Sequence, residues 1–262
     1  MSPSWRDQVS VFFGPGHVHL ARIAKGWRPQ PGMGVSVACG DAAGGWEPAL
    51  EALGRALSGL RWQGADARVT VSNHFVRYAL VPSPGKLRGE TERAAAARHA
   101  LRATFGERAE RWRVVLGEGH AGDGVAAGIE PELIEGLVAT LAAANLRPVA
   151  IEPFLAAAFN LCRESIRDAP AWLAAAEPGR VCVARFDHGA WRWLRSERVR
   201  SRLEEELPAV LERARLAGDA GAGRVLLVSR EEPQVELAAA SGWSLERVRF
   251  GAAGAAAAGT EH

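Results

Sequence analysis

The stretch VSVFFGPGHVHLARI, residues 9–23, decides how the fold of this chain is interpreted. Short apolar or alternating runs at residues 9–13 and 18–24 flank the turn residues GPG. Two such runs around a glycine turn predict a β-hairpin. Residues 32–38 are suited to a third strand, and residues 46–60 place leucines at helical spacing. With the β-branched run RVTVS at residues 68–72, the pattern predicts three strands, a helix and a strand.

This order of elements returns farther along the chain. RVCVARF at residues 180–186, the turn DHG and AWRWLRS at residues 190–196 predict a second hairpin. A helix over residues 202–217, a strand over 224–229, a helix over 233–240 and a last strand over 243–248 follow. The duplication, which begins near residue 9 and again near residue 181, predicts two similar α/β lobes facing each other across a cleft.

The predicted domain boundaries follow from this duplication. The first lobe comprises residues 1–75 and 146–175, and residues 76–145 form an α+β subdomain inserted into it. Residues 176–250 form the second lobe. The low-complexity end, FGAAGAAAAGTEH, predicts a disordered tail over residues 251–262.

The composition excludes several classes of function. The 32 basic and 30 acidic residues leave a net charge of +2, so no strong field attracts nucleic acid, and we expect no nucleic-acid partner. The three cysteines, Cys39, Cys162 and Cys182, lie far apart without a CxxC pair, which argues against a metal site and fits a reducing compartment. No apolar run reaches the ~18 residues of a membrane span, and the start lacks a signal peptide. We therefore expect a cytoplasmic protein.

Four stretches carry a resemblance to a known family. They are the opening hairpin, RVTVSNHFVRYALVPSPG (residues 68–85), FGERAERWRVVLG (residues 105–117) and RPVAIEPFLAAAFN (residues 147–160). In this element order the chain resembles the PilM-type assembly proteins of type IV pili and the cytoplasmic part of GspL-type secretion proteins. The resemblance implies the fold of the actin-like ATPase superfamily, with two tandem ribonuclease-H-like lobes.

The resemblance also implies where nucleotide motifs would lie. In actin-like ATPases the first phosphate loop carries Asp-x-Gly, and its aspartate organises magnesium. Here Phe12 takes the aspartate's place, and His19 stands where a lysine often follows. Gly14 and Gly16 keep the turn, but Pro15 removes one backbone donor. A phenyl ring cannot replace a carboxylate, so this site is degenerate.

The other two motifs are also incomplete. Asp187-x-Gly189 in FDHGAW matches the start of a second phosphate loop, although Asp-x-Gly is also ordinary hairpin-turn chemistry. Ser229 and Arg230 stand where a Gly-Gly pair would let the backbone approach adenosine. We therefore expect a non-catalytic relative, with no bound nucleotide cofactor and no metal.

The resemblance then implies a scaffolding function in type IV pilus biogenesis or a related secretion system. The expected partner is the cytoplasmic tail of a PilN-type inner-membrane protein, which would recruit the chain to the membrane; self-association is left open. Asn73, Arg77 and Tyr78 are the partner-binding candidates, with an exposed strand arginine as the plainer interpretation of Arg77. Two alternatives stay open: a nucleotide-binding actin-like ATPase, and a domain whose vestigial cleft holds another small ligand.

Overall fold

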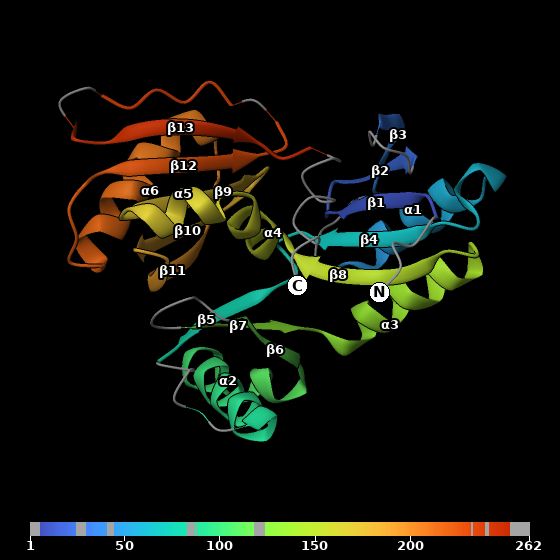
Figure 1. Ribbon diagram of the computed structural model, residues 1–262, viewed down its shortest axis with the longest axis horizontal. Helices are drawn as coiled ribbons and strands as arrows, with labels where there is room; N and C mark the ends of the chain where they lie inside the picture. Colours follow the sequence, from blue (N-terminus) through green and yellow to red (C-terminus); the bar gives the residue numbers. More distant parts are fainter. Residues whose placement is uncertain are drawn as a thin grey trace. The chain divides into compact units, whose positions relative to one another are not determined.

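The computed structural model describes residues 6–24, 30–40, 45–82, 87, 89–117, 124–231, 233–238 and 241–251 (Figure 1). The chain divides into two compact units. The first contains Met1–Phe75, Glu130–Ala157 and Gly251–His262, and the second contains Val76–Ile129 and Ala158–Phe250. Each unit is built around a mixed five-stranded sheet, which confirms the predicted α/β class with two ribonuclease-H-like lobes.

The sheet of the first unit has the strand order β3-β2-β1-β4-β8. β1 (Gln8–Phe13), β2 (His17–Ala24) and β3 (Gln30–Ala38) run antiparallel to their neighbours. β4 (Asp66–Val71) lies parallel to β1, and β8 (Arg147–Pro153) lies parallel to β4. The hairpin predicted from the opening stretch is therefore confirmed.

Two helices pack side by side against this sheet. They are α1 (Glu47–Leu57), which is followed by the short helix η1 (Leu60–Trp62), and α3 (Pro131–Ala143). Each helix buries apolar side chains at helical spacing, which the sequence had indicated for α1. A Cβ atom at Gly136 would lie 2.7 Å from Leu50 Cδ2, so the absence of a side chain there lets the two helices approach closely.

The sheet of the second unit has the strand order β11-β10-β9-β12-β13. Its strands are β9 (Ala171–Glu177), β10 (Arg180–Asp187), β11 (Ala190–Arg198), β12 (Arg224–Ser229) and β13 (Ser244–Arg249). β10 is antiparallel to both β9 and β11, and β12 is parallel to β9 and β13. Strand by strand, this order repeats that of the first sheet.

The second repeat begins one strand earlier than predicted, at Ala171 rather than near Val181. The predicted first strand is in fact the second strand of the sheet. β9 escapes a prediction from propensity because its sequence, AWLAAAE, contains no β-branched residue. It is a strand because burial on both faces suits small side chains between two neighbouring strands, and all seven of its residues are buried.

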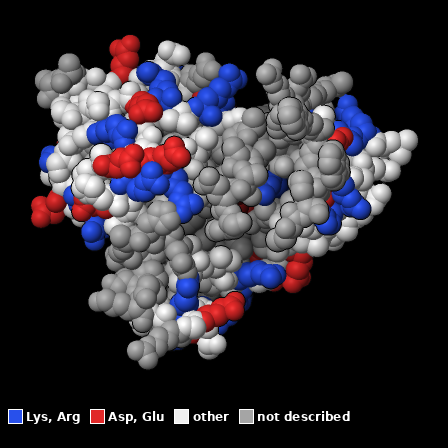
Figure 2. Space-filling view, in the orientation of Figure 1, with Lys and Arg blue, Asp and Glu red and all other residues white. Residues whose placement is uncertain are grey.

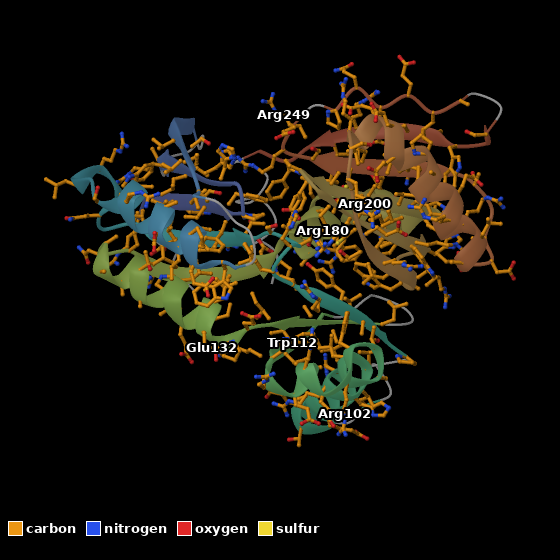
Figure 3. All side chains as sticks on the ribbon, turned by 180° about the vertical axis from the view of Figure 1, so that it is seen from behind. Arg102, Trp112, Glu132, Arg180, Arg200 and Arg249 are labelled. Carbon is orange, nitrogen blue, oxygen red and sulfur yellow. The ribbon has the colours of Figure 1, made fainter. Side chains whose placement is uncertain are left out.

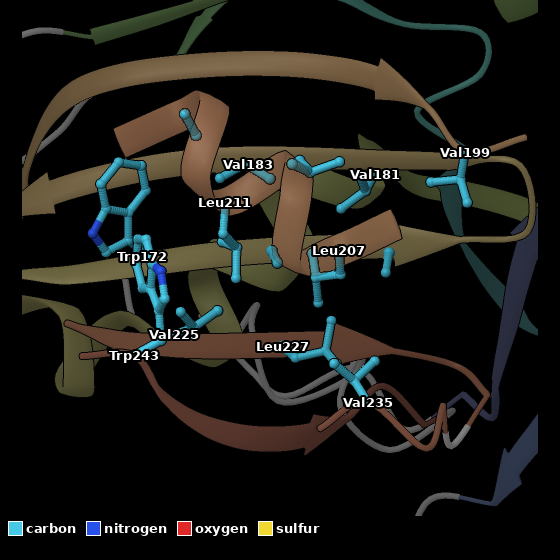
Figure 4. Packing of buried hydrophobic residues seen from close by; sticks show 14 residues of the cluster. Trp172, Val181, Val183, Val199, Leu207, Leu211, Val225, Leu227, Val235 and Trp243 are labelled. Atoms are coloured by element: carbon cyan, nitrogen blue, oxygen red, sulfur yellow. The ribbon is translucent and has the colours of Figure 1, made fainter. Parts of the chain in front are cut away.

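The core of the second unit lies between this sheet and α6 (Leu203–Ala217) (Figure 4). Leu207 and Leu211 of α6 face Val183 and Leu227 of the strands, and all four are buried. Trp172 packs edge-on against Trp243 with ring centroids 5.4 Å apart. On the other side, the short helices α4 (Phe154–Leu161) and α5 (Arg163–Asp168) lead into β9.

The predicted helix over residues 233–240 is wrong for residues 233–238, which form an irregular segment between β12 and β13; residues 239–240 lie outside the described residues. Val235 is fully buried and Leu237 packs partly against the same core. A spacing of two residues brings side chains to one side of an extended chain, not of a helix. The segment therefore stays extended.

Residues 76–129 form the insertion (Figures 1 and 3). β5 (Arg77–Val81), β7 (Gly124–Ile129) and β6 (Arg113–Gly117) make a three-stranded antiparallel sheet in the order β5-β7-β6. α2 (Gly89–Phe105), continued by η3 (Gly106–Arg111), packs against one face of it. The insertion is thus α+β, as predicted.

The compact units group the chain differently from the predicted domains. The insertion belongs with the second sheet, where β5 lies close to β11, and α3 packs on α1 in the first unit, although the predicted insertion extended to residue 145. Apart from Gly251, the predicted tail lies outside the described residues.

Basic and acidic side chains are interspersed on the face drawn in Figure 2. None of the helices in the described ranges is both long and apolar enough to cross a membrane.

Candidate functional site

The place of the magnesium-binding aspartate is occupied by a buried aromatic ring. Phe12 is 8% exposed and stands opposite His19 and Thr70 in the neighbouring strands. Its ring packs edge-on against Phe154, with centroids 5.5 Å apart, and lies 6.3 Å from the ring of His19. Edge-to-face packing at this distance is a favourable arrangement of aromatic rings. Phe12 is therefore part of the core of the first unit.

The turn after Phe12 contains Gly14 and Gly16 but offers few backbone donors. The Gly14 N–H donates to the His17 carbonyl oxygen at 3.3 Å, and Pro15 has no N–H. A Cβ atom at Gly14 would lie 3.2 Å from Cε1 of Phe12, so the ring lies directly against the turn. Phosphate-binding turns need several backbone N–H groups aimed at the anion. In this turn the Gly14 N–H is already bonded within the turn, and Pro15 has no N–H to donate.

His19, which the resemblance places where a lysine often follows, lies beside a second histidine. Its ring lies 5.9 Å from that of His17, in a stacked arrangement on the same face of β2. Within the described residues, no three side chains of the His, Cys, Asp or Glu types come together as a possible metal site. The prediction of no metal concerns the whole chain and stays a prediction.

In the second sheet, the hairpin that corresponds to β1–β2 is β9–β10, because β9 and β10 hold the same places in the strand order. Its turn consists of Pro178 and Gly179 between the paired residues Glu177 and Arg180. Gly179 has φ +76°, and a proline followed by such a glycine makes a type II turn. Glu177 is 8% exposed and stands two residues before Gly179. This carboxylate-x-Gly pattern was not among the predicted site residues, because no strand was predicted over residues 171–177.

Asp187 and Gly189 lie at the other end of the sheet, in the β10–β11 turn. Phe186 pairs with Ala171 at the start of β9, whereas Ser229 pairs with Ala176 near its end. At about 3.3 Å per residue, the two positions are about 17 Å apart along the strands. The structure therefore corrects the predicted second phosphate loop, which was placed in the wrong hairpin.

The β10–β11 turn has the features of an ordinary hairpin turn. His188 and Gly189 have φ values of +49° and +79°, as a type I′ turn requires. The Gly189 N–H donates to the Ile166 carbonyl oxygen at 3.1 Å, which ties the turn to α5. Hydrogen bonding to His188 lowers the pKa of the Asp187 carboxyl, with the charge of Arg192 adding to the effect. Asp187 is thus engaged with its own turn.

Ser229 is the last residue of β12, and Arg230 follows it. Both lie at the same end of the sheet as Glu177. Ser229 is buried, and its hydroxyl accepts a hydrogen bond from the Glu231 N–H at 3.2 Å. Burial lowers the pKa of Arg230, and the charge of Glu177 opposes this change. The residues that replace the Gly-Gly pair therefore include an arginine next to the buried carboxylate of the corresponding hairpin.

The three partner-binding candidates differ in burial and belong to different units. Asn73 lies in the first unit, is fully buried, and accepts a hydrogen bond from the Leu155 N–H in the first turn of α4 at 3.0 Å. Tyr78 lies on β5 in the second unit and is 9% exposed. Arg77 is half-buried; one Nη donates to the Val76 carbonyl oxygen at 3.0 Å. Of the three, only Arg77 keeps substantial exposed surface for a partner.

The fold is similar to several solved structures at low sequence identity. The cytoplasmic domain of EpsL, an inner-membrane component of the type II secretion system of Vibrio cholerae, matches with a TM-score of 0.64 and 11% identity over 95% of this chain and 92% of that one. A Bacteroides thetaiotaomicron protein with an actin-like ATPase fold and unknown function matches with a TM-score of 0.62 and 12% identity, over 86% and 82% of the two chains. A PilM–PilN type IV pilus biogenesis complex matches with a TM-score of 0.61 and 13% identity, over 84% and 81%.

Sequence comparison adds no relative to these. No family model matches the chain, and no curated protein matches it in sequence. At sequence identities of 11–13%, this structural similarity establishes the fold and nothing finer. The chain therefore has the actin-like ATPase fold.

Proposed function

We propose that this chain is a non-catalytic scaffold of type IV pilus biogenesis or of a related secretion system. It works by binding the cytoplasmic tail of a PilN-type inner-membrane protein, and so acts in the cytoplasm at the inner membrane. The similarity to the EpsL cytoplasmic domain and to the PilM–PilN complex supports this assignment. Because one fold serves many functions, the non-catalytic part of the proposal rests on the residues of the site.

The observation that carries the non-catalytic part of the proposal is the buried ring of Phe12. A magnesium–nucleotide site needs a carboxylate and several free backbone donors at this hairpin. Here the position is apolar and packed against Phe154, and the turn has Pro15 and an internally bonded Gly14 N–H. These features fit a fold retained for protein binding.

One observation favours the alternative, a nucleotide-binding ATPase. Glu177 and Gly179 place a carboxylate-x-Gly pattern in the hairpin that corresponds to β1–β2. Against it, Pro178 lacks a donor N–H, and the charge of Arg230 acts on Glu177. The nucleotide-binding ATPase is therefore the second candidate function, after the scaffold.

Titration calorimetry with Mg-ATP separates the two functions. The scaffold proposal predicts no saturable heat at millimolar nucleotide. Saturable binding that Glu177→Gln weakens would establish the alternative instead. The control is Asp187→Asn, which lies at the other end of the sheet and should leave any nucleotide signal unchanged.

A direct binding assay tests the partner. A fluorescent peptide with the sequence of the PilN-type protein's cytoplasmic tail should bind the purified chain with a saturable change in anisotropy. Arg77→Ala should weaken binding, because a guanidinium group recognises carboxylate or carbonyl oxygens in a fixed geometry. Arg185→Ala, which removes another half-buried strand arginine, is the matched control. A tail that does not bind the wild-type chain would contradict the proposal.

A further inference from the structure

The described parts of the three sheets end in six edge strands, and five of them are protected against pairing with another strand. An unpaired edge invites strand addition unless prolines, charges, bulges or a cover prevent it. Prolines stand in β3 and β8, and the β4–β8 register is also broken by a bulge. Exposed charged side chains occur along β11 and β13. β5 lies close to β11 within the second unit.

The sixth edge, β6, has only one of these features, a single charge at its end. Its sequence is RVVLG; it contains no proline, and its pairing with β7 is continuous. Arg113, at one end, is its only charged residue, and Val115, in the middle, is 62% exposed. Within the described sheet, β6 pairs with β7 alone, so part of its backbone N–H and C=O groups point outward.

We propose that β6 pairs with β6 of a second copy of this chain, antiparallel, around a twofold axis at Val115. In this register Arg113 faces Gly117 of the second copy, Val114 faces Leu116, and Val115 faces its own equivalent. The two arginines are then offset by four residues, about 13 Å along the strands. This exceeds the Debye length of about 8 Å at physiological salt, so they do not repel each other appreciably.

The apolar side chains of β6 also suit a symmetric partner. Val114 and Leu116 of β6, and Trp112 just before it, are half-buried and pack against the core beneath α2. Figure 3 labels Trp112 at the strands of the insertion and Arg102 on α2. A second β6 would cover the exposed remainder of these side chains and would extend the apolar layer to a second α2. A self-complementary patch of this kind is what a twofold interface requires.

Sedimentation equilibrium of the full chain over a range of concentrations tests the pairing. The wild type should move from the 27.9 kDa monomer toward twice that mass as concentration rises. Val115→Lys should lose the dimer, because it places like charges directly opposite each other. The exposed position of Val115 keeps this change from affecting folding. Val149→Lys, at a 43% exposed valine on β8, is the matched control and should dimerise like the wild type.

A charge-swap experiment tests the twofold axis itself. Val115→Glu alone should also be monomeric, whereas an equimolar mixture of Val115→Lys and Val115→Glu should dimerise again, since opposite charges then face each other. A wild type that stays monomeric overturns the proposal and would leave this edge to a strand of another protein. A dimer that both variants leave intact overturns it as well. Neither result depends on the pilus or secretion partner.

Discussion

Restoring the missing carboxylate should damage the first unit rather than create a nucleotide site. In Phe12→Asp, a ring that is 8% exposed and packed edge-on against Phe154 is lost. Truncation of a buried phenylalanine costs about 3–5 kcal/mol. The new carboxylate would also be buried, which adds a desolvation cost unless it stays protonated. We therefore expect the free energy of unfolding of the first unit to fall by at least about 4 kcal/mol.

Phe12→Leu is the matched control for this substitution. It keeps an apolar side chain and removes only part of the ring's volume, so it should lower the free energy of unfolding less than Phe12→Asp does. Urea unfolding followed by circular dichroism compares the two variants, and calorimetry with Mg-ATP follows on each. If Phe12→Asp unfolded at the same urea concentration as Phe12→Leu, the ring would not be the core residue described here. If it bound Mg-ATP, the turn would have the donors that we argue it lacks.

Three further predictions concern stability and reactivity. Gly128→Ala should destabilise the insertion by about 1–3 kcal/mol in urea unfolding, because its Cβ atom would lie 2.8 Å from a packed indole ring. Burial raises the pKa of Glu152, so the folded state holds this proton more tightly than the unfolded state, and stability falls as pH rises through the folded-state pKa. Glu152→Gln should therefore stabilise the chain more at pH 7 than at pH 4; an equal effect at both would contradict this. Burial raises the pKa values of Cys162 and Cys182 to about 12, so a thiol reagent at pH 8 should modify only the half-exposed Cys39 before denaturation, and all three cysteines after it.

Local patterns were enough to predict much of the architecture. The glycine turn between two apolar runs identifies the β1–β2 hairpin, and leucines at helical spacing identify α1. The absence of a carboxylate at Phe12, where the resemblance implies the aspartate of a first phosphate loop, can also be seen in the sequence. Only the structure shows that the Phe12 ring packs against Phe154.

Long-range pairing decided the rest. β9 has no β-branched residue and is a strand because β10 and β12 pair with it on both sides. Because β9 is a strand, the hairpin that corresponds to β1–β2 is the one with Glu177 and Gly179, not the one with Asp187 and Gly189.

Burial was likewise a tertiary result. The resemblance implied that Asn73 binds a partner, but only the folded chain brings its amide oxygen to the Leu155 N–H in the first turn of α4. The exposure of β6 also depends on which strands pair with it. Sequence alone thus determined the elements whose signals are local, namely the first hairpin, α1 and the α/β class. Strand partners and burial involve residues distant in the chain, and only the tertiary structure could decide them.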